Sequence, residues 1–346
     1  MNKTVTLTEF LEATGASLRF YDLGRRISKI SRNDFLQFEK LELVWPYPLQ
    51  QQAWFGLVML DANQKAEPVI WFLRFPLDET GKLMQAGRDY FIHRLFEAAT
   101  ATRTDNAATL ADALKDNPHV FKPRDDKMAV FHARLAKTLK QPASRFYAHA
   151  LEYFSGAQGW EQWNFVGFQG IADVSERLEE DNNTELLCNA IAELPTTPLE
   201  ALLQCLENRA VPHVLAEALQ QRLKQELEKD QPVVSTLAHL ARSVACSQSQ
   251  THKNHMLKQL LQSRYGVQAD ILAAIAARVW EWLYKPTNTA LYLEKLTQTP
   301  QDVFNNILAD LLYMPRLREI IMAQIRHPQR PDQLALAFSN MMKQYQ

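Results

Sequence analysis

The sequence has only three cysteines, and it lacks the short motifs through which many enzymes bind metals, phosphates or acyl groups. Cys188, Cys205 and Cys246 form no C-x-x-C pair, which argues against a zinc ribbon or a disulfide framework. No G-x-G-x-x-G, P-loop or G-x-S-x-G motif is present, which excludes nucleotide binding and serine nucleophiles through those motifs. We therefore predict that the cysteines are buried apolar residues of helices, and we assign no catalytic residue and no cofactor.

A strong charge excess and a long apolar run are also missing. Lys and Arg number 38 against 39 for Asp and Glu, a net charge of −1, whereas nucleic-acid-binding proteins usually carry a basic excess. The most apolar helical stretch, Ile271 to Tyr284, is interrupted by Arg278 and Glu281 and is shorter than the ~20 residues that span a bilayer. The first residues contain no apolar run of the kind found in signal peptides. We predict a cytoplasmic protein that does not contact membranes, and the charge balance disfavours nucleic-acid binding.

Glycine is unevenly distributed, and this divides the chain. Nine of the ten glycines lie at or before Gly170, and only Gly266 follows. Turns and strands use glycine, while helix interiors exclude it. The first part is therefore predicted to be mixed and the last part helical. We expect an α+β domain with antiparallel hairpins over 1–104, linker helices with an aromatic and glycine-rich junction over 105–170, and a helical domain over 171–346.

The first part contains clear signals for caps and strands. Thr6-Leu7-Thr8-Glu9 has the form of a capping box, and Ser31 with Asp34 begins a second helix. Strands are expected in two hairpins, Leu18–Asp22 with Arg26–Ile30 and Trp54–Leu60 with Val69–Phe75. The second pair is apolar on both faces, which is typical of a covered sheet. A helix over about 81–103 is expected to cover one face, and residues 104–124 are polar and predict a loosely ordered connection.

After residue 170, prolines occur where helices are expected to begin. In Thr197-Pro198 and Thr299-Pro300 we expect Thr at the N-cap and Pro at the first helical position, with an acidic residue in the first turn. Each segment carries apolar residues along one stripe, for example Leu199, Leu202, Leu203 and Leu206. Short amphipathic helices joined by tight turns predict a degenerate HEAT-like α-solenoid, with a compact helical bundle as the competing arrangement.

Two N-terminal segments are candidates for contact with a partner. The turn that holds Asp22, Arg25 and Arg26 offers guanidinium groups that suit a phosphate or a carboxylate. The alternative is a hairpin turn in which Asp22 pairs with one of the arginines. In Trp45-Pro46-Tyr47-Pro48-Leu49-Gln50, prolines bracket an aromatic residue, so Trp45, Tyr47 and Gln50 are candidate anchors, or else they close the edge of the sheet.

The aromatic junction and a histidine pair complete the candidates. Trp160 and Trp163 lie among glycines, which suits either a loop that closes over a ligand or, as we favour, a packing seam between domains. His252-x-x-His255 has a spacing that places two imidazoles on one helix face, but the neighbouring sequence supplies no third ligand except Cys246. We predict a polar helix start there and no metal.

Three N-terminal runs together resemble a known family. They are Phe20–Arg26, Pro46–Trp54 and Ile70–Asp78, and they are similar to an uncharacterised gammaproteobacterial family, domain-of-unknown-function family 3549. The resemblance covers the whole chain and implies a bacterial cytosolic protein. It implies no activity, cofactor or site residue.

Three functions follow as hypotheses, and the leading one is a protein–protein interaction or scaffold module. Stacked helix pairs form extended surfaces that need no catalytic pocket. The alternative is an enzyme with a site at the domain junction, lined by Trp160, Trp163 and Asp173, where a small-molecule ligand would bind. A weaker alternative is nucleic-acid binding through the basic turn at Arg25 and Arg26.

Overall fold

The computed structural model describes residues 5–61, 67–102, 114 and 116–344, and it divides into two compact units. Unit 1 comprises Met1–Pro123 with Leu312–Pro315, and unit 2 comprises Arg124–Leu311 with Arg316–Gln346. The helices expected between 125 and 154 therefore belong to the helical unit. Most of the connection expected over 104–124 lies outside the described residues, because 103–113 and 115 are not among them.

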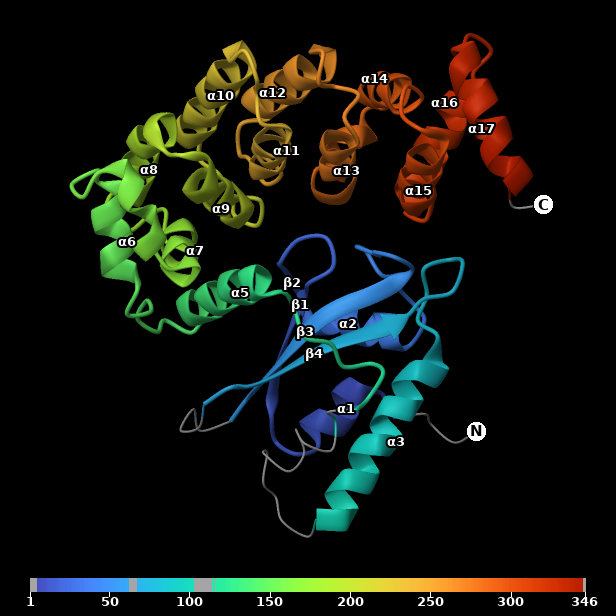
Figure 1. Cartoon of the computed structure of the whole chain (residues 1–346). Helices are drawn as coiled ribbons and strands as arrows, with labels where there is room; N and C mark the ends of the chain where they lie inside the picture. The colour runs from blue at the N-terminus through green and yellow to red at the C-terminus, as the bar shows by residue number, and fades with distance from the viewer. Residues whose placement is uncertain (1–4, 62–66, 103–113, 115, 345–346) are drawn as a thin grey trace. The chain divides into compact units, whose positions relative to one another are not determined.

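Unit 1 contains a four-stranded antiparallel sheet with the order β2-β1-β3-β4 (Figure 1). Its strands are β1 (Ser17–Asp22), β2 (Ser28–Ile30), β3 (Gln52–Leu60) and β4 (Val69–Pro76). Both predicted hairpins are confirmed, since β1 pairs with β2 and β3 pairs with β4. A pairing that the sequence did not predict joins them: β1 runs along β3, with Phe20 opposite Leu57.

In the described part of unit 1, three helices accompany the sheet: α1 (Leu7–Glu12), α2 (Arg32–Glu39) and α3 (Gln85–Thr102). The predicted capping box is present, because the Thr6 side chain accepts from the backbone N–H of Glu9 and the Glu9 carboxylate accepts from that of Thr6. The α1 N-terminus is also capped from outside, where the buried Glu39 carboxylate accepts hydrogen bonds from Leu7 N (2.6 Å) and Thr8 N (3.1 Å).

The core of unit 1 is rich in aromatic rings, which explains the apolar strands. On one face Phe20 stacks on Phe35 at 3.9 Å, and the α3 residue Phe91 contacts Phe75 at 6.0 Å. On the other face Trp54 of β3 meets Phe121 at 4.9 Å. Both faces of β3 and β4 are thus covered, as the apolar pattern predicted, by helices on one side and in part by the segment around Phe121 on the other.

Unit 2 consists of helices in its described part, apart from one isolated bridge between Val211 and Ser247. They are α5 (Asp125–Thr138), α6 (Tyr147–Phe154), η1 (Trp160–Phe165), α7 (Phe168–Glu176), α8 (Asn183–Glu193), α9 (Thr196–Leu206), α10 (His213–Glu228), α11 (Val234–Ser243), α12 (Gln250–Gln262), α13 (Ala269–Arg278), η2 (Trp280–Tyr284), α14 (Pro286–Leu296), α15 (Gln301–Leu312), α16 (Pro315–Arg326) and α17 (Asp332–Gln344). The prediction of a mainly helical chain with a small N-terminal α+β part is confirmed.

The helices from α5 to α14 pack in two rows. Each odd-numbered helix contacts the next odd-numbered one from α5 to α13, and each even-numbered helix contacts the next even-numbered one from α6 to α14. Figure 1 shows the two rows following a curve, with α7, α9, α11 and α13 on its inner side and α8, α10, α12 and α14 on its outer side. Neighbouring helices in a row bury their apolar stripes against each other.

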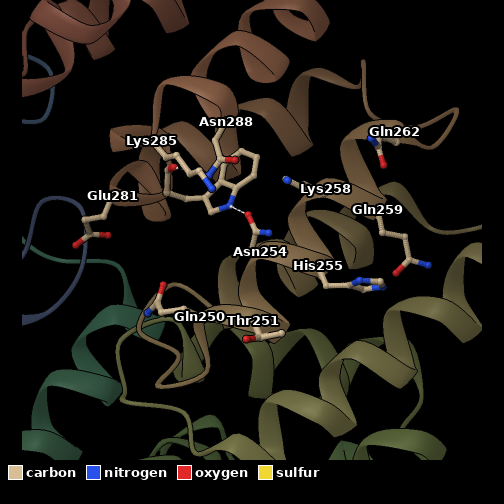
Figure 2. Close-up of a pocket in the computed structure, with 11 residues that line it drawn as sticks. Gln250, Thr251, Asn254, His255, Lys258, Gln259, Gln262, Glu281, Lys285 and Asn288 are labelled. Atoms are coloured by element: carbon tan, nitrogen blue, oxygen red, sulfur yellow. Dashed lines mark hydrogen bonds between the residues drawn. The ribbon is translucent and has the colours of Figure 1, made fainter.

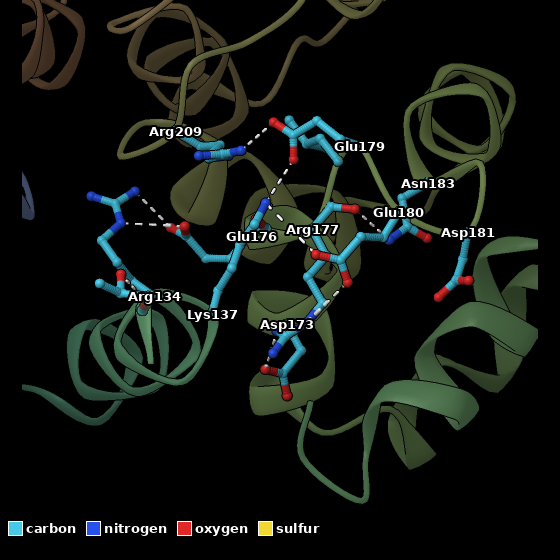
Figure 3. Close-up of polar contacts among 12 residues, drawn as sticks. Arg134, Lys137, Asp173, Glu176, Arg177, Glu179, Glu180, Asp181, Asn183 and Arg209 are labelled. Carbon is cyan, nitrogen blue, oxygen red and sulfur yellow. Dashed lines mark hydrogen bonds and ion pairs between the residues drawn. The ribbon is translucent and has the colours of Figure 1, made fainter. Parts of the chain in front are cut away.

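Ion pairs connect consecutive helices of the inner row. The buried Glu207 carboxylate accepts from Arg242 Nε at 2.5 Å and lies 3.1 Å from Arg278 Nε, so one side chain links α9, α11 and α13. Figure 3 shows a second network, in which Arg134 of α5 pairs with Glu176 at the end of α7 at 2.6 Å. Arg209 and Lys137 both contact Glu179 within that network.

Two predicted helix starts are shifted. Helix α9 begins at Thr196 after an extended Pro195, so Thr197 lies inside the first turn and is not the N-cap. Helix α15 begins at Gln301, so Pro300 precedes it. Helix α14 has Pro286 at its first position, as the proline pattern favours. A proline near a helix start is compatible with several positions, and the preceding loop decides which one is used.

Candidate functional site

The turn that holds Asp22, Arg25 and Arg26 is largely buried within unit 1. Asp22 and Arg25 are 1% and 0% exposed, and Arg25 Nε donates to the carbonyl of Pro48 at 2.9 Å. A side chain added at Gly24 would lie 3.4 Å from the carbonyl of Tyr47. The two predicted contact segments therefore pack against each other, and of the three charged residues only Arg26 keeps partial exposure.

Trp45 is a core residue, while its neighbours remain accessible. It is 1% exposed and packs on Phe38 with a ring separation of 4.8 Å. Tyr47 is half-buried and lies with Trp45 beside a cavity of about 320 Å³ that Lys29 and Asp34 also line. Gln50 is exposed and has a left-handed φ of 51°. Of these three candidates, Tyr47 and Gln50 retain surface for contact with a partner.

The aromatic junction lies within unit 2 and packs on α6. Trp160 meets Tyr153 at 5.8 Å, and Tyr153 Oη donates to the carbonyl of Trp160 at 2.9 Å. Trp163 is half-buried. Asp173, named above as a possible site residue, is 1% exposed and accepts from Ser144 N and Arg177 Nη1, each at 3.1 Å. These bonds give Asp173 a structural role in joining the end of α7 to the segment before α6.

A groove in unit 2 is a candidate site for a ligand. It lies between α12 and the segment from η2 to α14, with a volume of about 900 Å³, and we call it the α12 groove (Figure 2). Ligand-binding pockets usually enclose about 300–1,000 Å³. Most of the residues that line it carry polar groups, although carbon atoms make up the larger part of the exposed lining: Gln250, Thr251, Asn254, His255, Lys258, Gln259, Gln262, Glu281, Trp282, Lys285 and Asn288.

The spacing on α12 explains why one side of the groove is continuous. Gln250, Asn254, Lys258 and Gln262 are four residues apart, so they form one stripe along the whole helix. The opposite side of α12 buries Met256, Leu257, Leu260 and Leu261 in the unit. An amphipathic helix has thus turned its amide-rich face toward the groove.

Trp282 determines how Asn254 faces the groove. Its indole Nε1 donates to Asn254 Oδ1 at 3.2 Å. An indole nitrogen only donates, so the bond requires the Asn254 oxygen and leaves the amide nitrogen on the other side. Figure 2 shows that nitrogen away from the hydrogen bond. The groove therefore presents two amide N–H donors in a fixed orientation.

Asn288 contributes a polar atom at the edge of the same groove. Its Nδ2 donates to the carbonyl of Trp282 at 2.9 Å, which fixes the amide. Its Oδ1 is buried and accepts no hydrogen bond from the described residues. A buried acceptor without a donor costs about 1–3 kcal/mol.

The charged side chains of the groove are mostly positive. Lys258 and Lys285 form no ion pair with any described residue, and Glu281 is the acidic residue of the lining. Two lysines and one glutamate give a formal local charge of +1, with histidine left out of the count. Such a site attracts a ligand of modest negative charge.

The histidine pair on α12 does not form a metal site with other described residues. His252 Nδ1 lies 2.7 Å from Gln220 Oε1, and His255 lines the α12 groove. The described residues contain no cluster of three or more His, Cys, Asp or Glu side chains with metal-binding geometry.

Cys205 is buried, and burial raises the pKa of its thiol well above the ordinary value. Within the described ranges, no helix is both long enough and apolar enough to cross a membrane.

The α12 groove was not predicted from the sequence. His252 and His255 were assigned to a polar helix start, although Gln250, Asn254, Lys258 and Gln262 recur at a four-residue spacing. The other side of the groove comes from η2, whose position depends on folding. A long polar stripe on a helix between apolar neighbours was the available signal.

Comparison with known proteins places the chain in a family but gives it no activity. No curated protein and no solved structure matches it. The model of the family described as proteins of unknown function, DUF3549, matches residues 2–342. The match covers nearly the whole chain, so both units are included. The chain belongs to the DUF3549 family.

Proposed function

We propose that unit 2 is a protein–protein interaction module that docks a segment of a partner protein in the α12 groove. The α12 groove, open along a whole helix and lined by amide groups and by two lysines that have no ion-pair partner among the described residues, is the observation that carries the proposal. The two helical rows supply the support, as in α-solenoid proteins, which use extended surfaces for binding.

The chemistry of the lining suits a polypeptide. Side-chain amides both donate and accept hydrogen bonds, so they match the alternating N–H and C=O groups of a peptide backbone. The groove holds five such residues, Gln250, Asn254, Gln259, Gln262 and Asn288. Helix α12 positions four of them and α14 the fifth, and such pre-positioning reduces the entropy that binding costs. The partner is proposed to be another cytoplasmic protein.

A peptide-display selection tests the proposal. The full chain is immobilised and panned against random peptides, and enriched peptides are synthesised and measured by fluorescence polarisation. Gln259→Trp places a bulky side chain in the groove, whereas Gln225→Trp makes the same change on an exposed position of α10. We expect Gln259→Trp to weaken binding about tenfold or more and Gln225→Trp to leave it unchanged.

Two results would overturn this function. The first is a selection that enriches no peptide. The second is a set of enriched peptides that bind the Gln259→Trp variant as tightly as the wild type. Circular dichroism spectra of both variants establish that the substitutions leave the helices folded.

A further inference from the structure

We infer that the occupant of the α12 groove is an extended, acidic segment of about five residues. This inference rests on the proposed docking function and specifies the class of partner segment. Three independent features carry it: the length of the polar stripe, the fixed direction of its donors, and the charge of the two lysines.

The length of the stripe sets the size of the segment. Gln250 and Gln262 begin and end α12, and a helix rises about 1.5 Å per residue, so the stripe is about 18 Å long. An extended chain advances about 3.3 Å per residue. About five extended residues therefore match the groove, whereas a helical segment of the same number would cover less than half of it.

The direction of the donors favours an extended backbone. Trp282 holds the Asn254 oxygen, so Asn254 offers N–H groups to a partner's carbonyl. Asn288, on the other side of the groove, has its Nδ2 bound to the carbonyl of Trp282 and its Oδ1 buried, so the oriented donors come from α12. An extended strand has free N–H and C=O groups along both edges, while a helix satisfies its own.

The lysines favour acidic side chains on the segment. Lys258 lies near the middle of the stripe, and Lys285 lies across the groove before α14. Figure 2 shows both side chains in the groove region, with Asn254 between α12 and the opposite wall. Neither has an acidic partner among the described residues, so a partner's carboxylate would give each ammonium its first ion pair.

The test uses three labelled hexapeptides of alternating alanine with glutamate, glutamine or lysine, measured by fluorescence polarisation against the full chain. We expect the glutamate peptide to bind about tenfold more tightly than the glutamine peptide and the lysine peptide to bind most weakly. Lys258→Ala and Lys285→Ala should each weaken the glutamate peptide about threefold, as for exposed ion pairs. Lys224→Ala, on α10 outside the groove, should not.

The outcomes separate the inference from the proposed function. If display-selected peptides bind in the groove but the glutamate peptide gains nothing over the glutamine peptide, docking stands and the acidic class is wrong. If the glutamate preference survives in the double variant Lys258→Ala/Lys285→Ala, the assignment to these lysines is wrong. A single-stranded thymidine oligonucleotide that binds more tightly than the glutamate peptide, with the same lysine dependence, would overturn the inference in favour of nucleic acid.

Discussion

Trp282 and Asn254 form a hydrogen bond of 3.2 Å that joins the two sides of the α12 groove. Trp282 is 6% exposed, so it supports the groove from beneath and contacts little of its open volume. Asn254 is half-buried and reaches the groove directly. The ring of one residue thus orients the donors of the other.

Removing the indole N–H should weaken binding in the groove. Trp282→Phe keeps an aromatic ring but leaves the Asn254 amide free to rotate. We expect the affinity for a groove-binding peptide to fall about threefold to tenfold, because one oriented hydrogen bond contributes roughly 0.5–1.5 kcal/mol. Isothermal titration calorimetry measures this. Asn254→Asp, which keeps the acceptor for Trp282 but removes the donors, should weaken binding at least as much, and an unchanged affinity in both variants would contradict the assigned orientation.

Glu207 should be among the most important side chains for the stability of unit 2. Its carboxylate faces two guanidinium groups, from Arg242 and Arg278. Glu207→Ala leaves both without this partner, and we expect a loss of about 2–3 kcal/mol in the free energy of unfolding, reduced by the partial exposure of the arginines. Urea denaturation measures the loss. Glu185→Ala, at an exposed position of α8, serves as the control and should change stability by less than about 0.5 kcal/mol.

Gly266 should not tolerate even a methyl group. A Cβ at this position would lie 2.1 Å from the carbonyl oxygen of Leu261, which is backbone and is fixed by α12. We expect Gly266→Ala to destabilise the protein by about 3 kcal/mol. Gly167→Ala is the matched control, because its Cβ would meet the Phe146 ring at an ordinary 3.6 Å. Thermal unfolding that shifts equally for both variants would contradict this packing.

A glycine in the turn at Gln50 and Gln51 should stabilise unit 1. Both residues have left-handed φ angles, 51° and 58°, and Leu49 and Gln52 exchange backbone hydrogen bonds across them. This conformation favours glycine at the second position. Gln51 is exposed, so we expect Gln51→Gly to stabilise unit 1 by about 0.5–1 kcal/mol. Gln51→Ala removes the same side chain but keeps the Cβ, and an equal gain from it would refute the conformational explanation.

Glu39 should make the protein less stable as the pH rises. A carboxylate with a lowered pKa in the folded state does the opposite. Burial raises the pKa of Glu39 above 4.5, although hydrogen bonds from Thr8 and Leu7 and the charge of Arg88 oppose the shift. The folded state therefore holds the proton more tightly than the unfolded state. The wild type should lose stability relative to Glu39→Gln as the pH rises from about 4.5 through the raised folded-state pKa. Denaturation at a series of pH values measures the difference, and a gap that widens in favour of the wild type would show that the pKa is lowered instead.

Local patterns predicted the elements of unit 1 well. The capping box at Thr6, the start of α2 at Ser31 and the apolar runs of β3 and β4 are each determined by neighbouring residues, and all are present. The pairing of β1 with β3 was not predicted, because it joins segments separated by a helix. The burial of Arg25 and Trp45 was missed for the same reason, since both are covered by contacts distant in sequence.

In unit 2 the sequence predicted helices, but not the side-chain hydrogen bonds that tie the starts of α8 and α14 to the preceding segments. Asn183 Nδ2 donates to the carbonyl of Arg177, and Asn288 Nδ2 donates to that of Trp282, each six residues earlier. The following threonines, Thr184 and Thr289, donate to the next carbonyl along in both cases. The two Asn-Thr pairs are far apart in the sequence, so nothing there links them. Their equivalent hydrogen bonds show that they form the same capping arrangement.

Site-specific photocross-linking tests the central claim most directly. A benzophenone amino acid is introduced in place of Thr251, which lines the α12 groove, and separately in place of Gln225 on α10. Each full-length variant is irradiated with the labelled alanine–glutamate hexapeptide. We predict a cross-linked product from the Thr251 variant and none from the Gln225 variant. Equal labelling of the two, or labelling at Gln225 alone, would contradict docking in the α12 groove.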